Sequence, residues 1–248
     1  MSLAALFRRA AQDAGDREFL VGWSSGKREV VERVTFAEYM LRASLVARSL
    51  SVEGGKPIAL LSSPSIAYFV CVGGVYLGGG VVINFSWQQS PAALAHAVEA
   101  LSPAILVVST ACVPLSKAAE RLAPNFAARR VLDGSGADAL ITTLPTPAPS
   151  LPPALAGEKV LTKATVAAIF FTAGSTGYPK AVPLAHGGLL WACEQRLLRL
   201  GGRDAVSRGV LSFSSASHVS MLVHSFVFAA YAQVRHLRVI QGLGRGGG

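Results

Sequence analysis

Val166-Ala-Ala-Ile-Phe-Phe-Thr-Ala-Gly-Ser-Thr-Gly-Tyr-Pro-Lys-Ala-Val-Pro-Leu184 is the stretch that says most about the fold of this 248-residue chain. Its first six residues and its last four are apolar, and both runs have the short length that is typical of strands. The nine residues between them are rich in glycine and in hydroxyl side chains, which indicates a loop. The stretch therefore predicts a strand, a loop of ligand-binding composition and a second strand.

The loop holds the residue types that bind a polyphosphate. Glycines let the backbone approach phosphate oxygens, hydroxyls donate hydrogen bonds, and a lysine offsets the negative charge. The spacing differs from that of a Walker A loop, because Tyr178 and Pro179 separate the last glycine from Lys180 and Ala181 follows the lysine. A P-loop nucleotidase is therefore disfavoured.

Around this loop, short apolar runs alternate with helical patterns. Thr35-Phe-Ala-Glu38 has the form of a capping box, and the N-terminal residues Leu3, Leu6 and Ala10 suit one face of a first helix better than a transit peptide. Alternating strands and helices are typical of an α/β fold with mixed or parallel sheet layers and flanking helices. In order, we predict a helix from residue 35, a strand at 57–61, a helix at 65–77, a strand at 81–84, a helix at 91–101, a strand at 105–108, a helix at 113–122, a strand near 130–132, and a helix at 187–200 with Leu190, Cys193, Leu197 and Leu200 along one face.

The composition divides the chain into three parts. Residues 1–132 form a first α/β lobe, residues 133–161 are a connection rich in proline and glycine, and residues 162–248 begin a second lobe that carries the loop. The chain is 51% hydrophobic and 15% charged, enough for a sizeable core. Its three cysteines show no pairing pattern, which favours a reducing compartment, and we expect the cytoplasm.

The formal charge of +9 would suit an anionic partner, but the basic residues are scattered, which argues against nucleic acid. The uncharged residues 66–85 have the length of a membrane span. Pro64, the run Gly78-Gly-Gly80 and the β-branched residues after it favour instead a buried helix, a turn and a buried strand.

The loop resembles that of the acyl-adenylate-forming (AMP-binding) superfamily, which includes acyl-CoA synthetases, adenylation domains of peptide synthetases and luciferases. Thr172-Ala-Gly-Ser-Thr-Gly-Tyr-Pro-Lys180 fits every position of that family's loop, with Ala173 and Ser175 as tolerated variants. Thr35-Phe-Ala-Glu38, Pro57-Ile-Ala-Leu-Leu-Ser-Ser-Pro-Ser65, Tyr76-Leu-Gly-Gly-Gly-Val-Val82 and Ser90-Pro-Ala-Ala-Leu94 are similar to the family's successive elements, in the family's order.

The resemblance implies that a carboxylate attacks the α-phosphate of Mg-ATP, giving an acyl-adenylate and pyrophosphate, and that CoA or a carrier-protein thiol can then take the acyl group. It assigns the phosphates to Thr172, Ala173, Gly174, Ser175, Thr176, Gly177 and Lys180, with Lys180 as a catalytic countercharge and Thr172 as a contact to Mg²⁺. It also aligns His218 with a histidine beside the acyl pocket, although Ser215 stands where the family has proline.

Several family motifs are absent from these 248 residues: aromatic-Gly-x-Thr-Glu, Thr-Gly-Asp and the lid domain with its catalytic lysine. The resemblance therefore implies an incomplete N-terminal domain, with the other half supplied in cis or in trans and little activity by this chain alone. A non-catalytic nucleotide-binding module and a membrane-associated protein anchored through residues 66–85 are the alternative interpretations.

Overall fold

The computed structural model describes residues 1–24, 26–27, 29–51, 55–123, 125–126, 128–132, 140, 161–172, 179–206, 209–212, 214–215, 217–234 and 237–241. The strands within these ranges are β1 (Glu18–Ser24), β2 (Glu29–Thr35), β3 (Pro57–Leu61), β4 (Val81–Phe85), β5 (Ile105–Val108), β6 (Ala128–Val131), β7 (Val166–Thr172), β8 (Lys180–Ala185), β9 (Val210–Ser212) and β10 (Leu237–Gln241). The helices are α1 (Leu3–Ala14), α2 (Phe36–Ser49), α3 (Ile66–Leu77), α4 (Pro91–Leu101), α5 (Val113–Glu120), α6 (His186–Arg199), α7 (Val219–Met221), the π-helix η4 (Leu222–Val227) and α8 (Phe228–Ala232), with 3₁₀ turns η1 (Thr110–Cys112) and η3 (Asp204–Val206).

Two mixed sheets organise these elements, which confirms the predicted α/β class. The six-stranded sheet has the order β6-β5-β3-β4-β7-β8, and all its pairs are parallel except β7 with β8. The four-stranded sheet has the order β2-β1-β10-β9, in which only β1 and β2 are antiparallel. Each sheet contains strands from both sides of the 133–161 segment.

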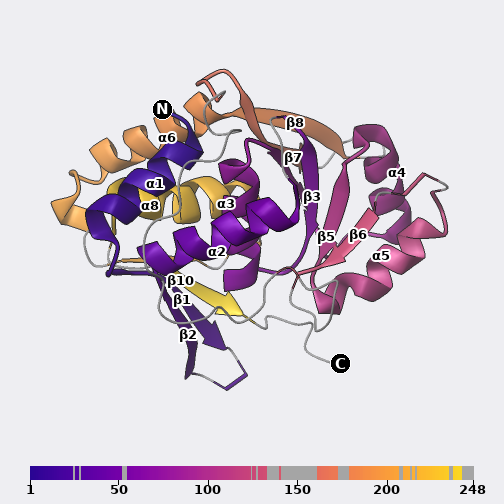
Figure 1. The fold of residues 1–248 in the computed structure, drawn as a ribbon, viewed down its shortest axis with the longest axis horizontal. Helices are drawn as coiled ribbons and strands as arrows, with labels where there is room; N and C mark the ends of the chain where they lie inside the picture. The colour runs from indigo at the N-terminus through magenta and orange to yellow at the C-terminus, as the bar shows by residue number, and fades with distance from the viewer. Residues whose placement is uncertain are drawn as a thin grey trace.

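The six-stranded sheet lies between two layers of helices. Figure 1 shows α4 and α5 on one side of it and α2 and α3 on the other. Successive side chains of a strand point to opposite faces, so both faces can be apolar. Ala59, Ile83 and Leu106 belong to the core under α4 and α5, whereas Ile58, Val82 and Val107 belong to the core that contains α2 and α3.

Helix α2 begins at the predicted capping box. The Thr35 hydroxyl accepts a hydrogen bond from the Glu38 backbone N–H, and the Glu38 carboxylate accepts one from the Thr35 N–H. These two bonds satisfy backbone donors that a helix start leaves without partners. The apolar positions that define its predicted face, such as Tyr39, Met40 and Ala43, are fully buried.

The uncharged segment 66–85 is a buried helix, a turn and a strand, as predicted from its sequence. Helix α3 is capped by Ser65 and ends at Leu77, and β4 begins at Val81. The interpretation of this segment as one membrane-spanning helix is therefore wrong, because its glycine run breaks the helix after 12 residues. Among the helices that the structure describes, none combines the length and the apolar character needed to cross a bilayer.

The other predicted elements are present, with small changes at their ends. Strands at 57–61 and 105–108 and the helix at 91–101 have the predicted bounds, whereas the helix predicted to reach residue 122 ends at Glu120. Leu200 does not lie on the buried face of α6. It follows the end of the helix and is 43% exposed, while Leu189, Leu190 and Cys193 form the buried face.

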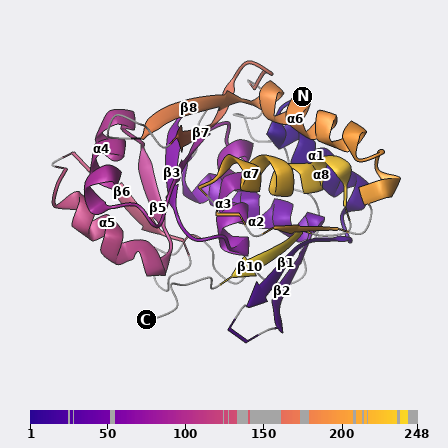
Figure 2. The ribbon, with the colours of Figure 1, turned by 180° about the vertical axis from the view of Figure 1, so that it is seen from behind.

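Most of the predicted connection lies outside the described residues, so the three-part division of the chain stays a prediction. Helices α6 and α1 both pack against α8 at one end of the molecule. Figure 2 shows this end from behind. This packing brings the start of the chain beside the segment that follows the predicted loop.

Candidate functional site

The predicted loop connects the two strands of a hairpin. Thr172 and Lys180 are paired across β7 and β8, and both are exposed. Because β7 runs parallel to β4, Thr172 lies at the edge where the parallel strands have their carboxyl ends. Open α/β sheets bind ligands outside this edge. The loop residues Ala173, Gly174, Ser175, Thr176 and Gly177 themselves lie outside the described residues.

An aromatic contact that the sequence did not reveal fixes the base of this loop. The Phe171 ring, directly before Thr172, stacks on the Phe85 ring at the carboxyl end of β4, with centroids 5.4 Å apart and an interplanar angle of 24°. Ile169 and Phe171 also pack against the core under α4 and α5. The carboxyl ends of β4 and β7 are thus held together just before the chain enters the loop.

Lys180 brings a positive charge to this position. No ion pair links its ammonium group to a described residue, and the side chain is exposed. A lysine placed across a hairpin from a threonine, with both at the loop base, can meet an anion from one side of the loop. The arrangement suits a phosphate group better than a neutral ligand.

Buried polar groups also lie near the carboxyl ends of the neighbouring strands. The Asn84 side-chain oxygen accepts a hydrogen bond from the Tyr68 hydroxyl, while its side-chain nitrogen has no partner within the described part of the chain. The Ser109 hydroxyl, just after β5, is likewise buried without a partner there. Such groups usually find a partner or a water molecule, and neither was marked by the sequence.

His218 lies in a separate segment, at the start of α7. Its side chain is exposed, and Nδ1 lies 2.9 Å from the Ser220 hydroxyl, which in turn donates to the Ser214 hydroxyl at 3.2 Å. Among the residues that the structure describes, no hydrogen bond joins His218 to Thr172 or Lys180. Its role beside an acyl pocket therefore stays a prediction.

His186 lies at the other end of the β7–β8 hairpin from the loop. It is fully buried, and its Nδ1 accepts a hydrogen bond from the Leu3 backbone N–H at 3.2 Å. Burial and the nearby N-terminal ammonium group lower the pKa of His186 to about 4. The ring is therefore neutral near pH 7, and it joins the start of α1 to the start of α6.

Known proteins share this fold. The N-terminal domain of FACL13 from Mycobacterium tuberculosis, solved with an inhibitor, superposes with a TM-score of 0.78 at 18% identity, covering 96% of this chain and 56% of that one. The anthranilate CoA ligase AuaEII, solved in complex with anthranoyl-AMP, gives a TM-score of 0.75 at 16% identity over 98% of this chain and 44% of that one.

Similarity in sequence points the same way. The FR901469 synthetase of Dothideomycetidae sp. (strain 11243) is 28% identical over 200 residues, which are 79% of this chain and 1% of that protein. The chain thus spans about half the length of the two solved chains and a small part of the synthetase. A family model described as AMP-binding enzyme matches residues 7–236, from within α1 to beyond α8, and the chain accordingly belongs to the AMP-binding enzyme family.

Proposed function

We propose that residues 172–180 bind the polyphosphate of ATP and that the chain contributes to the activation of a carboxylic acid as an acyl-adenylate. The observation that carries the proposal is the pairing of Thr172 with Lys180 at the carboxyl edge of the parallel strands. Membership of the AMP-binding family supports it. The complex of AuaEII with anthranoyl-AMP supports activation of an acid by a protein of the same fold.

In the proposed reaction, a carboxylate oxygen forms a bond to the α-phosphorus of ATP, and the bond from that phosphorus to the bridging oxygen of the β-phosphate breaks. Pyrophosphate leaves with the electron pair. The Lys180 ammonium offsets the charge that develops on it, together with the backbone and hydroxyl donors at Gly174, Ser175, Thr176 and Gly177. Donors that are already in place lower the barrier because they need no reorganisation during the reaction.

Thr172 is suited to a magnesium ion that arrives with the nucleotide. Mg²⁺ in nucleotide sites is held mainly by phosphates and water, with one or two protein oxygens, and the Thr172 side chain is exposed at the loop base. Within the described ranges, no group of three or more His, Cys, Asp or Glu side chains could hold a metal ion. When bound, the ion supplies charge neutralisation of the phosphates.

Completion of the active site is proposed to require a further part of the protein, in cis or in trans. The chain spans 56% and 44% of the two solved chains, so the acid and its thiol acceptor, CoA or a carrier protein, are proposals for the whole protein. Positioning of the acid against the α-phosphate supplies much of the rate in such reactions. We expect little acid-dependent exchange of pyrophosphate into ATP by this chain alone.

Calorimetric titration with magnesium pyrophosphate and with Mg-ATP tests the binding. Lys180→Ala is expected to raise the dissociation constant for pyrophosphate about tenfold, because a charge-assisted hydrogen bond is lost. Lys27→Ala is the matched control, since Lys27 is exposed between β1 and β2, which belong to the other sheet. Equal affinities of all three proteins, or no binding, would overturn the proposal.

A further inference from the structure

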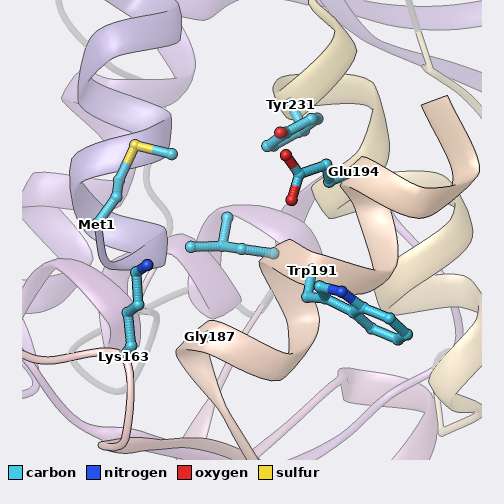
Figure 3. A pocket seen from close by; sticks show the side chains of 7 residues that line it. Met1, Lys163, Gly187, Trp191, Glu194 and Tyr231 are labelled. Carbon is cyan, nitrogen blue, oxygen red and sulfur yellow. The ribbon is translucent and has the colours of Figure 1, made fainter. Parts of the chain in front are cut away.

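A hollow lies on the surface of the molecule, away from the ends of the loop. It has a volume of about 520 Å³ and is bordered by α6, α8 and the start of the chain before α1 (Figure 3). Lys163 and Gly187 line it, and they lie beyond the Val166–Ala185 end of the hairpin, whereas the loop leaves from the Thr172–Lys180 end. Since strands rise about 3.3 Å per residue, the two places are roughly 20 Å apart. Its lining residues are Met1, Lys163, Gly187, Leu190, Trp191, Glu194 and Tyr231.

Opposite charges face this hollow from opposite sides. Figure 3 shows the Lys163 side chain rising below Met1 and the Glu194 carboxylate, on α6, turned toward the same space from the other side. Both side chains are exposed, and neither forms an ion pair with a described residue. Each charge is therefore available to a ligand group of opposite sign.

The wall that carries Lys163 is built by hydrogen bonds. The Gly187 N–H donates to the Lys163 carbonyl at 2.8 Å, and the His186 N–H donates to the Thr165 carbonyl at 3.0 Å. The Thr162 N–H donates to the Thr165 hydroxyl at 3.0 Å, which closes the turn. A Cβ atom at Gly187 would lie 2.9 Å from the Lys163 carbonyl oxygen, so only glycine allows this approach. The backbone of Lys163 is thus held in place before any ligand binds.

Apolar surface lies between the two charges. Leu190 is 8% exposed and lines the hollow together with Met1. Tyr231 borders the hollow next to Glu194 (Figure 3). Burial and, after it, the Glu194 carboxylate raise the pKa of Tyr231. The phenol is therefore neutral and able to donate a hydrogen bond. The Trp191 ring, 63% exposed, stands at the edge. Pockets of this volume suit small molecules, and a few polar groups in the pocket wall set the orientation of the ligand.

We propose that this hollow binds a small zwitterion with an apolar body, of the size of a dipeptide. Its carboxylate lies toward Lys163, its ammonium group toward Glu194 and Tyr231, and its side chains against Leu190 and Met1. The two charges select the ligand's direction, and the apolar floor contributes affinity by burial. The site is separate from the phosphate loop, so it can be tested independently of the proposed function.

The test is a titration of the chain with L-leucyl-L-leucine, followed by the fluorescence of Trp191 and by calorimetry. We expect N-acetyl-L-leucyl-L-leucinamide, which lacks both charges, to bind at least about tenfold more weakly. Lys163→Gln and Glu194→Gln are each expected to raise the dissociation constant of the free dipeptide about fivefold to tenfold. Trp191→Phe identifies the fluorescence signal, and its circular dichroism serves as a check on folding.

Lys180→Ala is the control that separates this site from the loop. It is expected to bind the dipeptide as the unmodified chain does, while its pyrophosphate affinity falls. The proposal is overturned if the free dipeptide shows no binding at about 10 mM, because its dissociation constant would then lie well above that concentration. It is equally overturned if the blocked dipeptide binds as tightly, or if neither Lys163→Gln nor Glu194→Gln, shown to be folded by circular dichroism, changes the affinity.

Discussion

His186 has a titratable ring that is fully buried. Its Nδ1 accepts from the Leu3 N–H, the Tyr76 ring stands edge-on to it with centroids 5.9 Å apart, and its Nε2 has no partner within the described part of the chain. A charged imidazolium would lose hydration here and face the N-terminal ammonium, which is why its pKa falls from 6.5 to about 4.

We predict that this histidine makes the chain less stable in acid. Below pH 6.5 the unfolded chain takes up a proton on this ring, while the folded chain does not until about pH 4. The free energy of unfolding therefore falls as the pH drops through this window, by at most about 3 kcal/mol. Urea denaturation of the unmodified chain and of His186→Gln measures this contribution. The carboxylates titrate in both proteins, so their effect cancels in the difference between the two free energies of unfolding. The advantage of the unmodified chain should shrink between about pH 7.5 and pH 4.5. A constant difference would contradict the prediction.

At the scale of elements, two glycines decide how closely α2 and α3 pack. A Cβ at Gly73 would lie 1.9 Å from the Tyr39 hydroxyl oxygen, and a Cβ at Gly74 would lie 2.7 Å from Val46 Cγ1. Tyr39 is fully buried and its hydroxyl donates to the Phe69 carbonyl at 3.4 Å, so the ring has no free space to enter. The close crossing depends on the absence of side chains at these positions.

Gly73→Ala is predicted to lower the free energy of unfolding by about 3 kcal/mol, because overpacking forces Tyr39 or the helices to move. Gly188→Ala on α6 is the matched control. Nothing lies within 4 Å of a Cβ at that position, so alanine should stabilise the chain by about 0.5–1 kcal/mol through its helix propensity. Thermal and urea denaturation of both variants measure these changes in the free energy of unfolding. Equal effects of the two substitutions would show that the helix crossing does not limit packing.

The elements that the sequence predicted are those with local signals. The capping box at Thr35, the proline at the first position of α4 and the apolar runs of β3, β4 and β5 are each visible within a few residues. The four-stranded sheet was missed. Its strand β2 contains three charged residues and is only partly buried, and β9 has three residues, so both depend on the sheet that joins β1 to the distant β10. The apolar run Phe19-Leu-Val21 in β1 was the usable signal.

At the scale of the whole molecule, long-range contacts join the two predicted lobes. Leu20 of β1 pairs with Leu237 of β10, and Ile83 of β4 pairs with Ile169 of β7. The Phe226 ring lies 5.0 Å from Phe7 and 4.6 Å from Phe69 between centroids, and all three are buried. The loop motif could be found by reading nine consecutive residues. The hollow beside α6 could not, because Met1, Lys163, Glu194 and Tyr231 meet only after folding.

We predict that the chain survives a cut in the 133–161 segment as a complex of two pieces. A protease site inserted after residue 146 would separate residues 1–146 from the remainder, and both sheets would then be shared between the pieces. Apolar burial across β1–β10, β4–β7 and the Phe226 contacts should keep them together at micromolar concentration. Size-exclusion chromatography after cleavage should give one peak containing both pieces, which separate in urea, and the uncut variant calibrates the elution volume. If the pieces instead elute apart while each keeps its circular dichroism, the two lobes fold independently, and the contacts between them contribute little to the stability of either.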